Sequence, residues 1–200
     1  MLRWLNVAFH AVPADVDETP RSGEAPATLT ARLARAKALA ARPVPPRDPV
    51  LAADTIVALQ DESLGKPRDA ADARSMLRRL QKAPHAVHTT VTLYDPARDR
   101  LYARHVTTNV TMRPYSEAEI QAYIASGNPL DKAGGYAIQH PGFAPVARVD
   151  RCYANVMGLP LCAVVALLRH VDCNLSLNLR RLCLDKFRYA CPGTDKGERL

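Results

Sequence analysis

The chain has 200 residues, of which 48% are hydrophobic and 24% charged, with a formal net charge of +7. This length and balance are typical of a soluble globular protein with a sizeable core, built as one domain or as two small lobes around a cleft. No apolar run could span a bilayer, no signal peptide is evident, and the basic residues form no run, so we expect a cytoplasmic protein that binds neither membrane nor nucleic acid.

The first part of the chain predicts a helix and a buried strand. Residues 1–10 indicate the end of a helix followed by a strand, and the Pro-, Gly- and acid-rich residues 13–27 a loop. Thr28 is a candidate N-cap of a helix that Pro43 ends, because apolar residues recur at helical spacing at Leu29, Leu33, Ala36 and Ala40. Residues 50–59 (V-L-A-A-D-T-I-V-A-L) are typical of a buried strand, and residues 61–67 of a turn or loop.

The middle of the chain alternates between helical and extended patterns. Asp69 is a good N-cap for a helix with one apolar face, formed by Ala73, Met76, Leu77 and Leu80. Alternating apolar residues over 87–93 and 106–112 predict a β-hairpin or two meander strands. Ser116 and Glu119 form a capping box for a helix that stops at Gly127.

The last part predicts a glycine-bearing loop over 128–143 with a short strand inside it, a strand near 144–149, and a helix that Pro160 opens. Helices and strands alternate with one hairpin among them, which predicts an α/β fold with a mixed sheet. After Val171 the pattern is ambiguous between a strand, a short helix and a loosely attached appendage.

The cysteines do not form a recognisable metal or disulfide motif. The number is odd and no C-x-x-C pair occurs, so we expect reduced thiols packed mostly as small apolar groups at Cys152, Cys162, Cys173, Cys183 and Cys191. His85 and His88 are three apart in a strand and should point to opposite faces, so they are not a metal-binding pair.

Asp54 is the most unusual residue of the sequence, because an acid in the middle of an apolar strand is costly to bury without a partner. Other polar residues stand at turns or strand ends and offer carboxylates for a divalent cation, lysines for phosphate and an amide for a base edge: Glu18, Lys37, Thr55, Lys66, Asp131, Lys132 and Gln139.

Each of these residues also has a plain structural interpretation. Glu18 suits a solvated acidic loop, Lys37 a lysine whose stem covers an apolar stripe, Lys66 a turn, and Gln139 a satisfied strand amide. Only Asp54 lacks a convincing alternative of this kind.

Several short motifs follow one another in a fixed order. They are V-P-A-D-V-D-E (12–18), R-L-A-R-A-K-A (32–38), A-A-D-T-I-V (52–57), L-G-K-P (64–67), S-E-A-E-I-x-x-Y-I-x-S-G (116–127), D-K-A-G-G-Y-A-I-Q (131–139) and N-V-M-G-L-P (155–160). Each is weak alone, but the ordered set resembles the Maf family of nucleotide pyrophosphatases. The resemblance covers residues 1–171 and leaves residues 172–200 as a C-terminal tail of unknown role.

The resemblance implies a Maf/ITPase-like fold, with an elongated mixed sheet flanked by helices and two lobes around a cleft. It implies an enzyme that hydrolyses nucleoside triphosphates to the monophosphate and pyrophosphate, with a divalent cation (Mg²⁺, with Mn²⁺ or Co²⁺ as alternatives), and a homodimer. The I-Q pair at 138–139 is similar to the branch acting on dTTP and UTP.

The resemblance also implies roles for six residues. Asp54 matches the proton acceptor and, with Glu18, a metal-binding carboxylate. Thr55 and Gln139 match substrate-binding positions that select the base. Lys37 and Lys66 match lysines that contact phosphate, and Glu18 also matches a position near the substrate.

One motif of the family is not matched. The family opens with a strand and an S-x-S-P-R-R turn, whereas Met1 aligns just past that turn. The alternative interpretation is therefore a catalytically impaired Maf-like protein with a non-enzymatic role.

Overall fold

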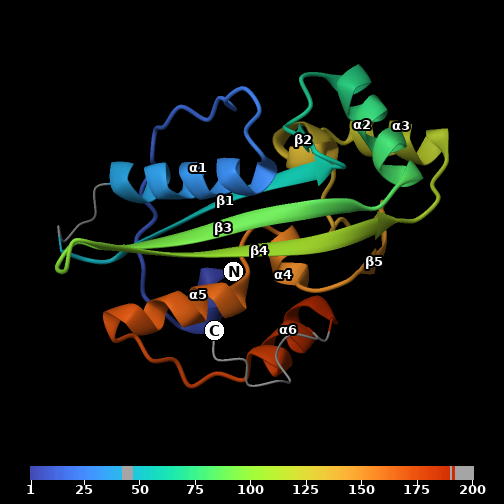
Figure 1. Ribbon diagram of the computed structural model, residues 1–200. Helices are drawn as coiled ribbons and strands as arrows, with labels where there is room; N and C mark the ends of the chain where they lie inside the picture. Colours follow the sequence, from blue (N-terminus) through green and yellow to red (C-terminus); the bar gives the residue numbers. More distant parts are fainter. Residues whose placement is uncertain (42–46, 190, 192–200) are drawn as a thin grey trace.

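The computed structural model describes residues 1–41, 47–189 and 191. Its centre is a five-stranded sheet with the strand order β2-β1-β3-β4-β5 (Figure 1). The strands are β1 (Val50–Leu59), β2 (Glu62–Leu64), β3 (His85–Asp95), β4 (Arg100–Met112) and β5 (Val146–Val149). The predicted α/β class, with an elongated sheet flanked by helices, is confirmed.

Helices cover both faces of the sheet and one of its ends. The α-helices are α1 (Pro26–Ala40), α2 (Ala70–Lys82), α3 (Glu117–Ala125), α4 (Tyr153–Val156), α5 (Leu161–Leu168) and α6 (Leu179–Phe187). Short 3₁₀ helices are η1 (Leu2–Leu5), η2 (Asn128–Asp131), η3 (Ala133–Gly135) and η4 (Arg169–Val171). In Figure 1, α1 lies on one face of the sheet, α5 and α6 on the other, and α2 and α3 beside one end.

The described strands pair only in the antiparallel sense, whereas a mixed sheet was expected. The reason is the route between β1 and β3. β1 ends at Leu59, and the chain then forms β2 and α2 before His85 starts β3 opposite the same end of β1. Because the chain re-enters the sheet at the end where it left, β3 must run opposite to β1.

The predicted helix signals are mostly confirmed. The Asp69 side chain accepts a hydrogen bond from the backbone N–H of Asp72, and Ser116 and Glu119 form both bonds of the capping box. The predicted cap at Thr28 is wrong, because α1 already begins at Pro26, whose ring presets the backbone angle of a first helical residue. α1 ends at Ala40, and the predicted stop at Pro43 lies outside the described residues.

Three predictions of local structure are wrong. Residues 6–10 form no strand, and residues 61–67 contain the short strand β2, because Gln60 adopts a left-handed conformation (φ 57°) that closes a tight hairpin between Leu59 and Glu62. The short strand expected inside 128–143 is replaced by η2 and η3, because Gly134 and Gly135 both adopt positive φ and turn the chain.

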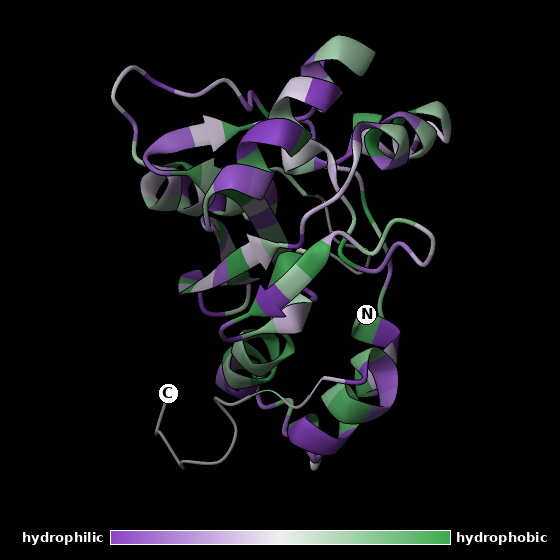
Figure 2. Ribbon diagram, turned by 90° about the vertical axis from the view of Figure 1, so that its right-hand side faces the viewer, coloured by the Kyte–Doolittle hydropathy of each residue, from purple (hydrophilic) through white to green (hydrophobic). Residues whose placement is uncertain are grey.

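Two apolar clusters form the core. One lies under α2 and α3 and includes Leu77, Leu80 and Ile120; the other lies between the sheet and α5 and includes Leu5, Val91, Leu161 and Val164. Figure 2 shows that the helices carry hydrophobic and hydrophilic residues side by side, as expected of helices that bury one face against a core.

The tail after Val171 forms a helix and packs on the second cluster. The Asn178 side chain caps α6, whose Leu179, Leu182 and Phe187 pack against that cluster. Of the three alternatives for this segment, the short helix is therefore correct. The strand and the loose appendage are wrong, because Asn178 caps a helix that packs on the core. None of the helices in the described residues is both long enough and apolar enough to cross a membrane.

Candidate active site

An open cleft of about 390 Å³ lies along the outer edge of β1. All six site residues predicted from the sequence line it: Glu18, Lys37, Asp54, Thr55, Lys66 and Gln139. Lys37 lies in α1, Asp54 and Thr55 lie in the middle of β1, and the others lie in loops or turns, so only the fold brings them together. Their chemical roles stay predictions.

The position of β1 in the sheet explains how Asp54 and Thr55 can share one cleft. Neighbouring strand residues point to opposite faces. β1 pairs with β3 on one side along its length, but on its other side the described strands pair with it only over Val57–Leu59. The cleft therefore wraps around the open edge of Ala53–Ile56 and reaches both faces of the sheet.

Asp54 is held by a lysine from α1. The ammonium Nζ of Lys37 lies 2.6 Å from Asp54 Oδ1 and 2.7 Å from Glu18 Oε1, so it bridges the two carboxylates. The Asp54 side chain is only 9% exposed, whereas that of Glu18 is 60% exposed. The unusual acid of the apolar strand is thus a buried carboxylate with a charged partner.

Burial and the Lys37 ammonium act in opposite directions on the pKa of Asp54. Burial raises the pKa of Asp54, and the hydrogen bond and charge of Lys37 offset only part of that rise. Burial lowers the pKa of Lys37, but its bonds to Asp54 and Glu18 outweigh this and leave the pKa raised. Lys37 therefore holds its proton more tightly than a free lysine, whereas Asp54 accepts a proton more readily than a free aspartate.

Another wall of the cleft carries two lysines, on two loops that are hydrogen-bonded to each other. Lys66 follows β2 and Lys132 precedes η3, and both line the cleft. The backbone N–H of Gly134 donates to the carbonyl of Gly65 at 2.9 Å, which joins the two loops. Lys132 also donates to Asp131 and to the Asn128 carbonyl. The sequence had singled out Lys132 without assigning it a role.

Thr55 is fixed on the α4 side of the sheet. Its hydroxyl lies 2.8 Å from that of Thr89, which donates to the Asn155 carbonyl at 3.3 Å. Asn155 is fully buried and binds the Val87 carbonyl through Nδ2. This network sets the position of the Val156–Gly158 wall of the cleft.

Tyr136 forms the floor of the cleft next to Gln139 and is anchored by a buried histidine. His85 Nε2 lies 2.8 Å from the Tyr136 hydroxyl. His88 contacts His105 instead, which confirms that His85 and His88 point to opposite faces. Neither Tyr136 nor the anchoring role of His85 was predicted, because each depends on a contact between residues 51 positions apart.

His85 should make stability depend on pH. Burial lowers its pKa to about 4, against about 6.5 in an unfolded chain. Between these values the unfolded state binds more protons, so stability is fully present above pH 6.5 and is lost as pH falls toward 4, by up to about 3 kcal/mol. In urea unfolding at pH 7.5 and 5, the loss should be clearly smaller in His85→Asn than in the wild type; an equal loss would contradict this assignment.

The donors of the cleft fit a hard divalent cation. Asp54 and Glu18 supply carboxylate oxygens that converge on Lys37 Nζ, and Mg²⁺ commonly binds one or two carboxylates and completes its shell with phosphate oxygens and water. No group of three or more His, Cys, Asp or Glu side chains in the described ranges is arranged to hold a metal by itself. These two residues would therefore hold a cation together with a phosphorylated substrate.

Comparison with known proteins identifies the family. Residues 1–171 match the model of the Maf family, described as Maf-like protein. The chain belongs to the Maf family. It is 45% identical over 171 residues to a dTTP/UTP pyrophosphatase of Geobacter sulfurreducens, covering 86% of this chain and 90% of that one. It is 49% identical over 165 residues to a protein of the same name from Salinibacter ruber, covering 80% and 79%.

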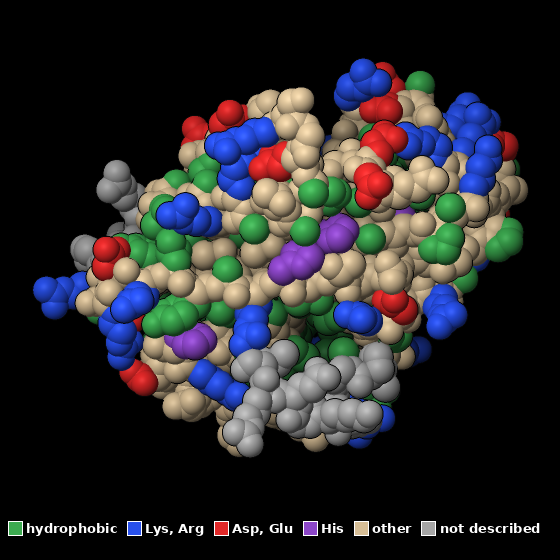
Figure 3. All heavy atoms as spheres, viewed as in Figure 1, with side chains coloured by type: hydrophobic (Ala, Val, Ile, Leu, Met, Phe, Trp, Pro, Cys, Tyr) green, Lys and Arg blue, Asp and Glu red, His purple; other side chains and the backbone are tan. Residues whose placement is uncertain are grey.

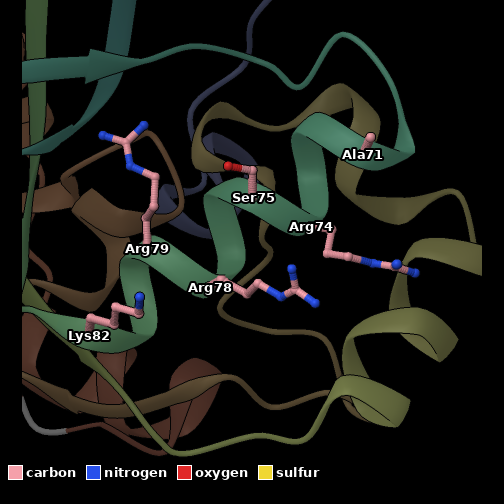
Figure 4. Close-up of a pocket in the computed structure, with 6 residues that line it drawn as sticks. All are labelled: Ala71, Arg74, Ser75, Arg78, Arg79 and Lys82. Atoms are coloured by element: carbon pink, nitrogen blue, oxygen red, sulfur yellow. The ribbon is translucent and has the colours of Figure 1, made fainter.

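This Maf chain has a second hollow that carries none of the predicted site residues. It lies on the outer face of α2, measures about 420 Å³, and is lined by Ala71, Arg74, Ser75, Arg78, Arg79 and Lys82 (Figure 4). The basic side chains diverge from one another, and Arg78 and Arg79 pair with Glu117 and Glu62. On the face seen in Figure 3, basic residues are likewise interspersed with acidic ones. The cleft at the edge of β1 is therefore the better candidate, because its polar groups converge.

Proposed function

We propose that this chain hydrolyses dTTP and UTP to the monophosphate and pyrophosphate. The observation that carries the proposal is the cleft at the edge of β1, where the strand-held carboxylate of Asp54 and the lysines of two loops line one space. The names of relatives 45–49% identical to the chain support this substrate class. A non-enzymatic role is not favoured, since the six predicted residues converge on one cleft.

The chemistry of the cleft suits attack of water on a phosphorus atom. Such a reaction needs a positioned water, a group that takes its proton, and positive charge near the leaving group. We assign the Asp54 carboxylate to orient the water and accept its proton. Lys66 and Lys37 are assigned to phosphate oxygens, where their charge would stabilise the departing pyrophosphate.

A divalent cation, Mg²⁺ or else Mn²⁺ or Co²⁺, is part of the proposal. Asp54 and Glu18 would hold it, and when bound it would supply positive charge to the phosphate oxygens. Lys37 already neutralises these carboxylates, so Lys37 must turn toward the phosphates when the cation binds. A homodimer also remains a proposal that rests on the family resemblance, and a cytoplasmic location remains an expectation from the sequence.

Gln139 is proposed to read the base. Its side chain is exposed and lines the cleft two residues after the buried Ala137. An amide both donates and accepts, so it can match a carbonyl oxygen and the neighbouring N–H of a thymine or uracil ring. Thr55, on the wall near Gly158, is the second residue assigned to substrate choice.

Gln139→Glu should change base preference rather than remove activity. A carboxylate can only accept hydrogen bonds, so it would repel the carbonyl oxygens of uracil while still accepting from an amino group such as that of cytosine. We expect kcat/KM for UTP to fall about 10- to 100-fold and that for CTP to change far less. Equal losses for both nucleotides, measured side by side, would argue against base reading by this residue.

The proposed function is tested by product analysis. The purified chain is incubated with Mg²⁺ and each of dTTP, UTP, CTP and GTP, and the products are separated by chromatography. We expect monophosphate and pyrophosphate in equal amounts, with dTTP and UTP turned over fastest. Release of the nucleoside diphosphate and orthophosphate would overturn the proposal, and so would a lack of turnover of all four nucleotides.

A further inference from the structure

Four of the five cysteines gather on the side of the sheet that carries α5. Cys152 immediately precedes α4, Cys162 lies in α5, Cys183 in α6, and Cys191 follows α6. Cys152, Cys183 and Cys191 are buried, at 9%, 3% and 5% exposure. Two of these cysteines belong to the family-matched region and two to the tail beyond it, so the cluster joins the two parts of the chain.

Cys191 is the common partner within this cluster. Its Sγ donates to the Arg151 carbonyl at 3.7 Å, and its thiol raises the pKa of both the Cys152 and the Cys162 thiol. All the cysteines are thiols in the structure, which agrees with the expectation from the sequence. Because Arg151 directly precedes Cys152, this bond places the Cys191 sulfur beside the backbone of Cys152, and both residues belong to the same buried cluster.

Aromatic packing holds the tail in place around this contact. The Phe187 ring stacks on Tyr153 with ring centroids 5.1 Å apart and meets Trp4 edge-on at 5.4 Å. The Tyr189 hydroxyl donates to the Val149 carbonyl at 3.0 Å. Cys191 therefore reaches the Arg151–Cys152 backbone through a docked segment with fixed contacts on both the core and the N-terminal helix.

We propose that Cys152 and Cys191 are an oxidative modification site, at which a low-molecular-weight disulfide converts the two thiols into an intramolecular disulfide. One cysteine thiolate attacks the small disulfide, breaks its S–S bond and releases one small thiol. The other cysteine then attacks the mixed disulfide, so that the protein S–S bond forms and a second small thiol leaves. The two protons of the cysteines end on the two released thiols, and the protein loses two electrons.

We assign Cys152, rather than Cys162, as the disulfide partner of Cys191. The Cys191 thiol is oriented toward the backbone of Arg151, the residue before Cys152, by its bond to that carbonyl. Both Cys152 and Cys191 belong to the buried cluster between the sheet and α5. Zinc is not the favoured ligand, because no group of three or more His, Cys, Asp or Glu side chains in the described part of the chain is arranged for a metal.

The disulfide would act on one wall of the cleft. Cys152 is the N-cap residue of α4, and Val156, Met157 and Gly158 at the other end of that helix line the cleft. A covalent link from Cys152 to the tail would restrict this short helix and the Gly158 carbonyl that faces Thr55. The tail outside the family match would thereby be tied to the wall that contacts the substrate.

The modification should be slow at neutral pH. The neighbouring Cys191 thiol and burial raise the pKa of the Cys152 thiol well above its usual range. Only the thiolate attacks a disulfide, so the rate should rise steeply with pH, up to about tenfold per unit, without a plateau near pH 8 or 9. A solvent-exposed thiol would level off there.

Peptide mapping of the intact chain tests the proposal. The protein is equilibrated with oxidised glutathione, quenched with an alkylating agent, and digested without reduction. We expect a single cross-linked peptide pair containing Cys152 and Cys191, and a thermal midpoint about 5–10 °C higher than in the reduced protein, since the 153–190 loop is closed. Mapping does not depend on nucleotide hydrolysis, so it can fail or succeed independently of the proposed function.

Variants and a metal assay complete the test. Cys191→Ala and Cys152→Ala should abolish the cross-link, whereas Cys173→Ala, also in the tail, should keep it. No cross-link in the wild-type protein, a cross-link through Cys162, or one equivalent of zinc bound by the reduced thiols would each overturn the proposal.

Discussion

Asp54→Asn is expected to lower kcat/KM for dTTP and UTP by about 10³-fold, within the range that general-base groups contribute. The amide has the size of the carboxylate and can still accept the Lys37 hydrogen bond, so the site keeps its shape. It cannot take a proton from water at neutral pH, and it binds a divalent cation weakly. Pyrophosphate release at saturating Mg²⁺ measures the effect.

A matched control is available in the turn that directly follows the same strand. Asp61 is an exposed acid in the turn between β1 and β2 and does not line the cleft. Asp61→Asn should keep activity within about twofold, because surface substitutions of this kind are usually mild. Thermal unfolding of both variants shows whether either change acts through stability. Full activity of a folded Asp54→Asn protein would remove Asp54 from the proposed mechanism.

Gly134→Ala is expected to destabilise the protein by about 2–4 kcal/mol and to lower activity. Gly134 has φ +70°, and an added Cβ would lie 3.0 Å from Val57 Cγ1 and 3.2 Å from two further Val57 atoms. Both the left-handed backbone and the contact with a buried side chain of β1 carry a cost. The loop that holds Lys132 would have to move away from Val57, and the bond from Gly134 to the Gly65 carbonyl would be broken or would shift Lys66 as well.

The variant Gly127→Ala is a control that separates the cost of the left-handed backbone from the cost of the contact with Val57. Gly127 has almost the same φ, +72°, but an added Cβ would meet no atom within 4 Å. Gly127→Ala should therefore cost only about 1 kcal/mol, the price of the backbone conformation. Adding Val57→Ala to Gly134→Ala should restore part of the lost activity by making room. Equal destabilisation by the two glycine substitutions in urea unfolding would show that the Val57 contact is unimportant.

The sequence singled out six residues that line one cleft, but not how they are arranged there. Asp54 could be singled out because an acid in an apolar strand needs a partner, but the identity of that partner depends on how α1 crosses β1. The local signals at Asp69 and Ser116 were sufficient for helix starts. They failed at Thr28, because the proline two residues earlier is itself a good first helical residue.

Features set by contacts distant in the sequence could not be predicted. Neighbouring residues of a strand point apart, so placing Asp54 and Thr55 in one cleft requires knowing that β1 has an open edge there. The anchoring of Tyr136 by His85 joins residues of two different elements. Similarly, Cys152 and Cys191 are too far apart in the sequence for any spacing rule, and only the docking of the tail brings them together.

The register between β1 and β3 has a consequence for how the cleft tolerates change. Asp54 is opposite Thr90, and Thr55 is opposite Thr89. The proposed proton acceptor and the proposed specificity residue are therefore neighbours in the strand, and this register decides which face of the sheet each one occupies. A slip of one residue would exchange their faces, taking the carboxylate from Lys37 to the α4 side. An insertion or deletion inside β1 would therefore abolish function even where the fold survives, whereas one at the hairpin tip between Asp95 and Arg100 would leave this alignment intact.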